Sequence, residues 1–342
     1  MTINKMRYIL SLIIAVVYSG TIWGITSPKV HDPVMAKGED GKYYIFATGM
    51  GIDVLSSADM KEWKREPSVF NRHNGIPQWA VDSVPGYKGH TWAPDISYHD
   101  GKWLLYYSCS TFGKNTSAIG LATNRTLDPK SPNFKWEDQG MVIKSHKHID
   151  NWNAIDPNMI SVSGQRVLVY GSFWDGIQLV KLAEDYKTPI SAPITIAIRI
   201  NRNLTTEELN QIENYTIEGG DTIEAGDNAI EAPFIIYNDG YYYLFVSFDY
   251  CCRGQASTYK TVYGRSRNIE GPYIDKNGKQ MLKGGGTLLY GPNERYYGIG
   301  HCSVYNFDGK WYFISHAYDK TKNGAAILFI KEIKFNKKRW IK

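Results

Sequence analysis

The sequence of 342 residues predicts an all-β fold, a five-bladed β-propeller with a central channel. Three observations lead to this prediction. Five segments share one plan, in which a short strand, a tight glycine turn and a second strand rich in Tyr, Trp, Phe and Val follow one another. The turn glycines lie 60 to 76 residues apart, which leaves room for two more strands per unit. Helical periodicity is almost absent. A β-sandwich is the alternative, but it explains the five-fold repeat less well.

The five units follow one another along the chain. Their hairpins are "HDPVMAKGEDGKYYIFATG", "TWAPDISYHDGKWLLYYSCS", "NAIDPNMISVSGQRVLVYGSF", "IEAPFIIYNDGYYYLFVSF" and "GHCSVYNFDGKWYFISHAYD", with turns at Gly41, Gly101, Gly164, Gly240 and Gly309. The longest interval contains residues 201–228, which we interpret as a surface excursion. The chain ends near Trp340 as the fifth unit finishes, so we expect no additional strand that closes the ring.

The N-terminal segment differs from the rest of the chain. We interpret residues 1–24 as a cleaved secretory signal peptide and residues 25–342 as one propeller domain, because Lys5 and Arg7 precede an apolar run that ends in small residues. An uncleaved membrane anchor is the alternative, but the run is shorter than the ~20 residues that a spanning helix needs. The mature protein is expected to be secreted or periplasmic, monomeric and free of the membrane.

Charge and cysteine content exclude several classes of function. The formal net charge of +5 falls to +3 without the two basic residues of the first 24, which is too small to indicate nucleic-acid binding. Cys251 and Cys252 are neighbours with Cα atoms ~3.8 Å apart, closer than an unstrained disulfide prefers. The sequence therefore predicts that either one, if oxidised, pairs with Cys109 or Cys302. No CxxC pair indicates zinc or redox chemistry.

The repeat places one set of residues at one end of the channel, because the first strand of each propeller blade lies innermost. Counting back eight or nine residues from the turn glycines gives Asp32, Trp92, Asp156, Glu231 and His301. A single acidic residue beside a proline is commonly a turn cap. Three carboxylates at equivalent positions crowd like charges together, which is typical of functional sites.

These residue types fit glycoside hydrolysis. One carboxyl protonates the departing oxygen while a second activates water or attacks the anomeric carbon, and a third raises the pKa of the acid and orients it. Trp92 offers a flat face on which a sugar can stack. His301 is either a hydrogen-bonded structural residue or the support of an ion held mostly by water.

At these residues the sequence resembles family 43 glycoside hydrolases, and among them the endo-1,5-α-L-arabinanases. The likeness covers nearly the whole mature chain and includes "HDPVM", "HTWAPDISYHDGKWLLYYSCSTFGKNTSAIGLAT", "NAIDPN", "YGSFWDGIQL", "IEAPF" and "GIGHCSV". The resemblance implies a secreted enzyme that cleaves α-1,5-L-arabinofuranosidic bonds in arabinan, a side chain of pectin, with inversion of configuration.

The resemblance also implies a role for each residue. Asp32 corresponds to the general base, Glu231 to the general acid and Asp156 to the carboxylate that tunes and orients the acid. An inverting pair stands roughly 6.5–9.5 Å apart to admit a water. The apolar neighbours of Glu231 should raise its pKa, whereas Asp32, beside the polar His31, should stay ionised.

The remaining implied contacts involve an ion and the sugar. His301 corresponds to a histidine near a calcium or similar ion, while Trp92 and Phe112 resemble sugar-contacting residues; no organic cofactor is implied. Two alternatives stay open. One is another family 43 activity, an α-L-arabinofuranosidase or β-xylosidase. The other is a propeller that binds glycans without cleaving them, which the retention of all three carboxylates argues against.

Overall fold

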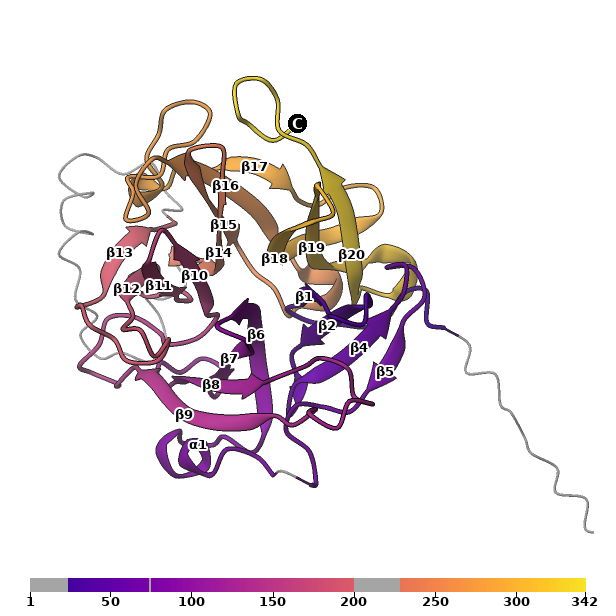
Figure 1. Cartoon of the computed structure of the whole chain (residues 1–342). Helices are drawn as coiled ribbons and strands as arrows, with labels where there is room; N and C mark the ends of the chain where they lie inside the picture. Colours follow the sequence, from indigo (N-terminus) through magenta and orange to yellow (C-terminus); the bar gives the residue numbers. More distant parts are fainter. Residues whose placement is uncertain (1–23, 74, 200–227) are drawn as a thin grey trace, which may run out of the picture.

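The computed structural model describes residues 24–73, 75–199 and 228–342, and this part of the chain is mostly β-strand (Figure 1). The predicted all-β fold is confirmed. The predicted signal peptide and the excursion fall, apart from Gly24 and Asn228, outside the described residues. None of the helices in these ranges has the length and apolar character that crossing a bilayer demands.

The described strands form four sheets around a common centre (Figure 1). The first sheet contains β1 (Val34–Lys37), β2 (Tyr43–Ala47), β4 (Asp53–Ser57) and β5 (Lys64–Glu66). The second contains β3 (Gly49–Met50), β6 (His90–His99), β7 (Lys102–Cys109), β8 (Ala118–Asn124) and β9 (Glu137–Lys144). The third contains β10 (Asn158–Val162), β11 (Gln165–Tyr170), β12 (Ile177–Lys181) and β13 (Ile194–Ala197).

The fourth sheet consists of two antiparallel groups. One group contains β14 (Ile230–Asn238), β15 (Tyr241–Phe248), β16 (Lys260–Ser266) and β17 (Thr287–Tyr290), and the other β18 (Tyr296–Phe307), β19 (Lys310–Asp319) and β20 (Ala325–Ile333). A single parallel residue pair, Lys260 with Ile299, connects them. In Figure 1, β1, β6, β10, β14 and β18 lie nearest the centre. Short helices, α1 (Gln78–Ser83), η2 (Gly254–Ala256), η3 (Met281–Lys283) and η4 (Lys320–Lys322), occur in the connections.

The five predicted hairpin turns are present. Each turn glycine has a positive φ between 77° and 82°, at Gly41, Gly101, Gly164, Gly240 and Gly309. In four of them the preceding residue also has a positive φ, at Asp100, Ser163, Asp239 and Asp308. Two successive positive φ angles suit the right-handed twist of the strands that the turn joins. The sequence signals of these turns therefore located the inner hairpins correctly.

Apolar side chains pack between neighbouring groups of strands in five clusters. Because successive side chains of a strand point to opposite faces, each second strand contributes to two clusters. The adjacent residues that enter different clusters are Ile45 and Phe46, Leu105 and Tyr106, Leu168 and Val169, Leu244 and Phe245, and Phe313 and Ile314. Burial on both faces explains why these strands are nearly continuous apolar runs.

The segment before β1 pairs with the last strand. Lys29 forms a β-bridge with Ile327 of β20, and the Leu328 N–H donates to the Pro28 carbonyl over 3.0 Å. In the described ranges this contact is an isolated bridge and not a strand, but the sequence prediction did not include it. The contact was missed because so short an extended segment carries no periodicity of its own.

Candidate active site

One residue in or just before each innermost strand has a left-handed backbone. These residues are Asp32 (φ 52°), Ala93 (φ 41°), Asp156 (φ 57°), Ala232 (φ 55°) and His301 (φ 50°). The strand register shifts at Ala93, Ala232 and His301, as it does in a β-bulge. Non-glycine residues adopt this conformation only where surrounding contacts hold them, and such strain concentrates at functional sites.

Side chains from neighbouring strands hold these five left-handed residues in place. Each of them donates its backbone N–H to one side chain. The pairs are Asp32 with His316 Nδ1 (3.1 Å), Ala93 with Thr48 Oγ1 (2.8 Å), Asp156 with Ser108 Oγ (3.0 Å), Ala232 with Asp156 Oδ2 (3.2 Å) and His301 with Ser247 Oγ (2.7 Å). Four of the acceptors lie in or directly after the second strand of a hairpin. The contact is thus a repeated feature of the fold.

The repeated bulge corrects one part of the sequence alignment. Trp92 and Glu231 precede the left-handed residues Ala93 and Ala232 by one position, so they are not equivalent to Asp32. The error arose because counting back eight or nine residues combined two adjacent positions. A shift of one residue matters, since neighbouring side chains of a strand point to opposite faces.

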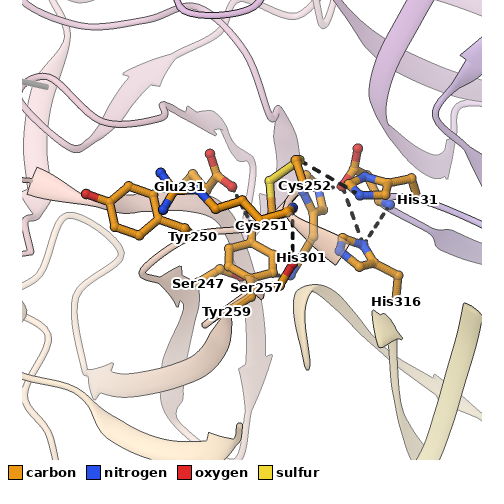
Figure 2. Close-up of a disulfide and its surroundings, with 12 residues drawn as sticks. His31, Glu231, Ser247, Tyr250, Cys251, Cys252, Ser257, Tyr259, His301 and His316 are labelled. Carbon is orange, nitrogen blue, oxygen red and sulfur yellow. Dashed lines mark hydrogen bonds and ion pairs between the residues drawn. A yellow bond between two sulfur atoms is a disulfide. The ribbon is translucent and has the colours of Figure 1, made fainter. Parts of the chain in front are cut away.

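Glu231 is buried among hydrogen-bond donors (Figure 2). Ser172 Oγ donates to Glu231 Oε2 over 2.8 Å, and the Tyr259 hydroxyl donates to Oε1 over 2.7 Å. Burial raises the pKa of Glu231 above its ordinary value and outweighs these two hydrogen bonds, which act in the opposite direction. Glu231 is therefore suited to carry a proton.

Asp32 has the opposite environment. Its Oδ1 contacts His31 Nδ1 at 2.9 Å and His301 Nδ1 at 3.0 Å, and its Oδ2 accepts a hydrogen bond from Thr48 over 2.6 Å. Burial by itself would raise the pKa of Asp32. The two histidines outweigh burial and hold this pKa well below the ordinary value. Asp32 is therefore an anion that can accept a proton.

Asp156 interacts electrostatically with the other two carboxyls. Its Oδ2 accepts the N–H of Ala232, the residue that follows Glu231. Burial raises the pKa of Asp156 well above the ordinary value, and the negative charges of Glu231 and Asp32 add to this effect. The fold therefore brings three carboxyls from distant parts of the sequence close enough to interact electrostatically.

His301 lies among these acids. Burial would lower the pKa of its imidazole, but the charges of Asp32, Asp156 and Glu231 outweigh burial and raise this pKa to about 9. His301 is therefore a cation at neutral pH. Within the described ranges, His31, Asp32 and His316 also present potential metal-ligand atoms that lie within 4.8 Å of one another. Hydrogen bonds occupy both histidines, since His31 Nδ1 contacts Asp32 and His316 Nδ1 accepts the Asp32 N–H.

Residues 24–341 match the glycosyl hydrolases family 43. The chain belongs to this family. The solved structure of an exo-1,5-α-L-arabinanase from a bovine ruminal metagenomic library is similar at 55% identity and a TM-score of 0.83, over 92% of this chain and 97% of that one.

Two further family 43 relatives resemble this chain over most of its length. A Cellvibrio cellulosa α-L-arabinanase, solved in complex with arabinohexaose, is 42% identical with a TM-score of 0.83, over 92% of this chain and 95% of that one. An extracellular endo-α-(1→5)-L-arabinanase of Bacillus subtilis (strain 168) is 40% identical, over 92% of this chain and 88% of its own length. The resemblance to arabinan-cleaving family 43 enzymes is confirmed.

The two predicted sugar-contacting aromatics occupy different positions in the family 43 chain. Trp92 is partly exposed in β6, where its Nε1 donates to His90 Nδ1 over 2.8 Å, and it precedes the bulge residue Ala93. Ala93 and Asp32 share Thr48 as a hydrogen-bond partner, so the residue after Trp92 lies close to Asp32. Phe112 lies in the loop after β7 and is 80% exposed.

The cysteine pairing in this family 43 chain differs from the sequence prediction. Cys251 and Cys252 form a disulfide with each other (Figure 2). Cys109 and Cys302 are buried free thiols. The prediction was wrong because it considered only the separation of the Cα atoms. Cys109 and Cys302 belong to strands β7 and β18 and pack inside two hydrophobic clusters, while the vicinal pair occupies a connecting loop.

Sequence reasoning missed most partners of the carboxyls. The side chains that form hydrogen bonds to the carboxyls, to the Asp32 backbone or to His31 are Thr48, Ser172, Tyr259, His316 and Tyr318. His31 carried a signal, because it precedes Asp32 directly. The others lie 16 to 287 residues from their partners along the chain, and no spacing rule indicates them.

Proposed function

We propose that this family 43 hydrolase cleaves α-1,5-L-arabinofuranosidic bonds in arabinan with inversion at the anomeric carbon. The main support is the contrast between two buried carboxyls, because the pKa of Glu231 is raised while that of Asp32 is lowered. An acid and a base are thus available in the same pH range. The arabinanases that resemble this chain, one of them bound to arabinohexaose, support the choice of substrate.

The proposed reaction moves two protons. Glu231 donates its carboxyl proton to the glycosidic oxygen as the bond to the anomeric carbon breaks. Asp32 accepts a proton from the water that attacks the same carbon from the opposite face. Ser172 and Tyr259 already donate to both oxygens of Glu231, so they stabilise the carboxylate that forms. Asp156 positions the acid, because its Oδ2 holds the N–H of Ala232, the residue that follows Glu231.

We infer that the fold is a five-bladed propeller around a central channel. The single residue pair between β16 and β18 supports the division of the fourth sheet into two blades. Five hydrophobic clusters and five left-handed residues, one in or just before each innermost strand, support the same number. The bridge between Lys29 and Ile327 would then close the ring by joining the N-terminal segment to the fifth blade.

We also propose that Trp92 and Phe112 contact the sugar chain. An exposed aromatic ring can stack on the C–H face of a sugar. Trp92 supports this role by its place beside Ala93 and Thr48, and Phe112 by its exposure.

A calcium ion beside His301 remains a proposal. The charges of Asp32, Asp156 and Glu231 favour a cation there. Calcium takes about 6–8 oxygen ligands, and a protonated His301 has no free lone pair, so water would have to supply most of the coordination shell. When bound, such an ion would supply positive charge close to the acids.

The location of the protein is also proposed. The printed name of the Bacillus subtilis relative describes it as extracellular, which supports a secreted or periplasmic enzyme with residues 1–24 as its signal peptide. We propose a monomer that carries the whole catalytic domain in residues 25–342.

Linear α-1,5-arabinan and xylan, incubated separately with the purified protein, test the proposed function. Arabinose or arabino-oligosaccharides should appear from arabinan alone. Release of xylose would instead support a β-xylosidase, and release of no sugar would contradict hydrolysis. Product length identifies the mode of cleavage: mixed oligomers indicate the endo action predicted from the sequence. A single short product would indicate exo action, which the 55% identical exo-arabinanase supports as the second candidate.

A further inference from the structure

The vicinal disulfide lies directly beside the site. Cys251 and Cys252 follow β15, and Cys252 Sγ is 3.9 Å from His31 Nε2 (Figure 2). Cys252 is exposed and has a left-handed backbone with φ 64°. The bond between adjacent residues closes a small ring that restricts this backbone. The disulfide thus fixes the direction of the Cys252 N–H.

The Cys252 N–H donates to the hydroxyl of Tyr318 over 2.7 Å. The same oxygen lies 2.9 Å from His31 Nε2 and 3.2 Å from His316 Nε2. The role of His316 follows from its other nitrogen, because His316 Nδ1 accepts the backbone N–H of Asp32. A neutral imidazole carries one proton, so His316 has it on Nε2 and donates it to Tyr318.

The position of His31 Nε2 indicates where the proton of Tyr318 goes. Besides the N–H groups of Cys252 and His316, the phenol oxygen interacts with the Ser257 side chain, and His31 Nε2, 2.9 Å away, is the nitrogen placed to accept the phenol proton. His31 is therefore the tautomer with its proton on Nδ1. That proton is donated to Asp32 Oδ1 over 2.9 Å. An unbroken series of hydrogen bonds connects the disulfide to the proposed base.

We propose that the Cys251–Cys252 disulfide is a positioning element of the active site, which holds the Cys252 N–H on Tyr318 and thereby keeps His31 in the tautomer that donates to Asp32. The inference rests on the proposed function, because it assigns the disulfide a part in orienting the base. Without the Cys252 N–H, Tyr318 is free to accept a proton from His31 Nε2. His31 Nδ1 would then point an unprotonated lone pair at the Asp32 carboxylate, and the hydrogen bond between His31 and Asp32 would be lost.

Reduction of the folded enzyme tests this role. Dithiothreitol supplies two electrons and two protons, so the disulfide becomes two thiols while the reagent closes to its own cyclic disulfide. On linear arabinan we expect kcat to fall about tenfold, which is less than the ~10²–10⁴-fold that acid–base catalysis contributes because the base is misoriented and not removed, and KM to stay within about twofold. Reoxidation should restore kcat. An unchanged kcat after complete reduction, verified by thiol titration, would overturn the proposal.

The double variant Cys251→Ser/Cys252→Ser is the matched control. It should have the low kcat of the reduced enzyme and should not respond to dithiothreitol. A variant with a lowered melting temperature but normal kcat would show a merely structural disulfide. Tyr318→Phe breaks the same series of hydrogen bonds, so adding it to the cysteine variant should cause no further loss of kcat. If the two losses of kcat multiply in the combined variant, the disulfide and Tyr318 do not act through the same hydrogen bonds, which would contradict the proposal.

Nitrogen-15 NMR spectra of the imidazoles report the histidine tautomers and test the inference without any substrate. His31, assigned through His31→Gln, should carry its proton on Nδ1 in the oxidised protein and lose that preference on reduction. An identical tautomer in both states would refute the inference even if arabinan is cleaved. An oxidised wild-type enzyme that does not cleave arabinan would refute the proposed function, while the spectra would still decide the role of the disulfide.

Discussion

At the scale of single residues, the environment of each carboxyl determines its role. Glu231 and Asp32 are both buried, yet only Asp32 is surrounded by histidines that offset the cost of its charge. Glu231 receives only neutral hydroxyl donors. Two identical functional groups therefore differ in protonation, which is the requirement for acid–base catalysis by a carboxyl pair.

Replacing the acid should abolish turnover and preserve binding. In Glu231→Gln the amide cannot donate a catalytic proton, so kcat should fall by about 10²–10⁴-fold on arabinan. Isothermal titration with an arabino-oligosaccharide should give a nearly unchanged Kd. Glu39→Gln, at an exposed turn, is the control and should keep full activity. Wild-type turnover in Glu231→Gln would remove Glu231 from the mechanism.

The pH profile should respond to the donors around the acid. Activity should rise as Asp32 ionises and fall as Glu231 loses its proton, so the alkaline limb reports the pKa of Glu231. The Tyr259 hydrogen bond favours the ionised form of Glu231. Tyr259→Phe should therefore move the alkaline limb of kcat/KM to higher pH, and Ser172→Ala should move it in the same direction.

A suitable control for this profile is Tyr44→Phe, which removes a hydroxyl that donates to Asp40 on a hairpin turn. Its alkaline limb should coincide with that of the wild type. A shift to lower pH in Tyr259→Phe would mean that the limb belongs to another group.

Sequence reasoning at the residue scale identified the acids and missed their partners. Asp32, Asp156 and Glu231 were visible because each precedes or lies near a proline at the start of an apolar strand. Thr48 and Tyr318 lie in ordinary second strands or directly after them, and only the fold brings them to Asp32 and His31. The vicinal disulfide was predicted wrongly, because a Cα separation says nothing about which strands bury the other thiols.

At the scale of secondary-structure elements, buried polar contacts set the relation between the innermost strands. Asn158 in β10 donates to Asp95 of β6 over 3.1 Å and accepts the N–H of Ile235 in β14 over 2.8 Å. Asp95 also accepts the N–H of Met159 over 2.8 Å. Three neighbouring inner strands are therefore joined by one buried amide.

Loss of this amide should destabilise the fold. Asn158→Ala leaves the Ile235 N–H without its acceptor and removes one of the donors to Asp95, and each buried unsatisfied group costs about 1–3 kcal/mol. We expect a lower midpoint in urea unfolding with an unchanged slope. Glu39→Ala, at an exposed site, should leave the midpoint within error. An unaffected midpoint in Asn158→Ala would show that the contact does not hold the strands together.

The elements were predicted better than their connections. Turn glycines and aromatic second strands located the hairpins, because both signals are local. The bridge from Lys29 to Ile327 joins residues almost 300 positions apart and has no local signal. The bulges at Ala93 and Ala232 were also invisible, since a bulge depends on the partner strand.

At the scale of the whole molecule, the ring of strands brings negative charge to its centre. Asp32, Asp156 and Glu231 come from three different sheets, and His301 is the cation that the described structure places among them. A divalent ion would compensate the same charge. Whether the enzyme uses one is a property of the assembled centre, which the sequence alone does not determine.

Ion binding should be visible in thermal unfolding. If calcium binds the native state, Tm should rise with calcium concentration and fall after treatment with a chelator. His301→Gln should abolish this dependence, while magnesium at equal ionic strength serves as the control for screening. A Tm and an activity that do not respond to either treatment would leave His301 with a purely electrostatic role.

The anomeric configuration of the first product tests the central claim most directly. Proton NMR spectra recorded during the first minutes of arabinan hydrolysis distinguish the two anomers before they interconvert. Attack by a water that Asp32 activates, on the face opposite the group protonated by Glu231, predicts the β-anomer from an α-linked chain. Initial release of the α-anomer would show retention of configuration and would contradict the assignment of Asp32 and Glu231 as an inverting pair.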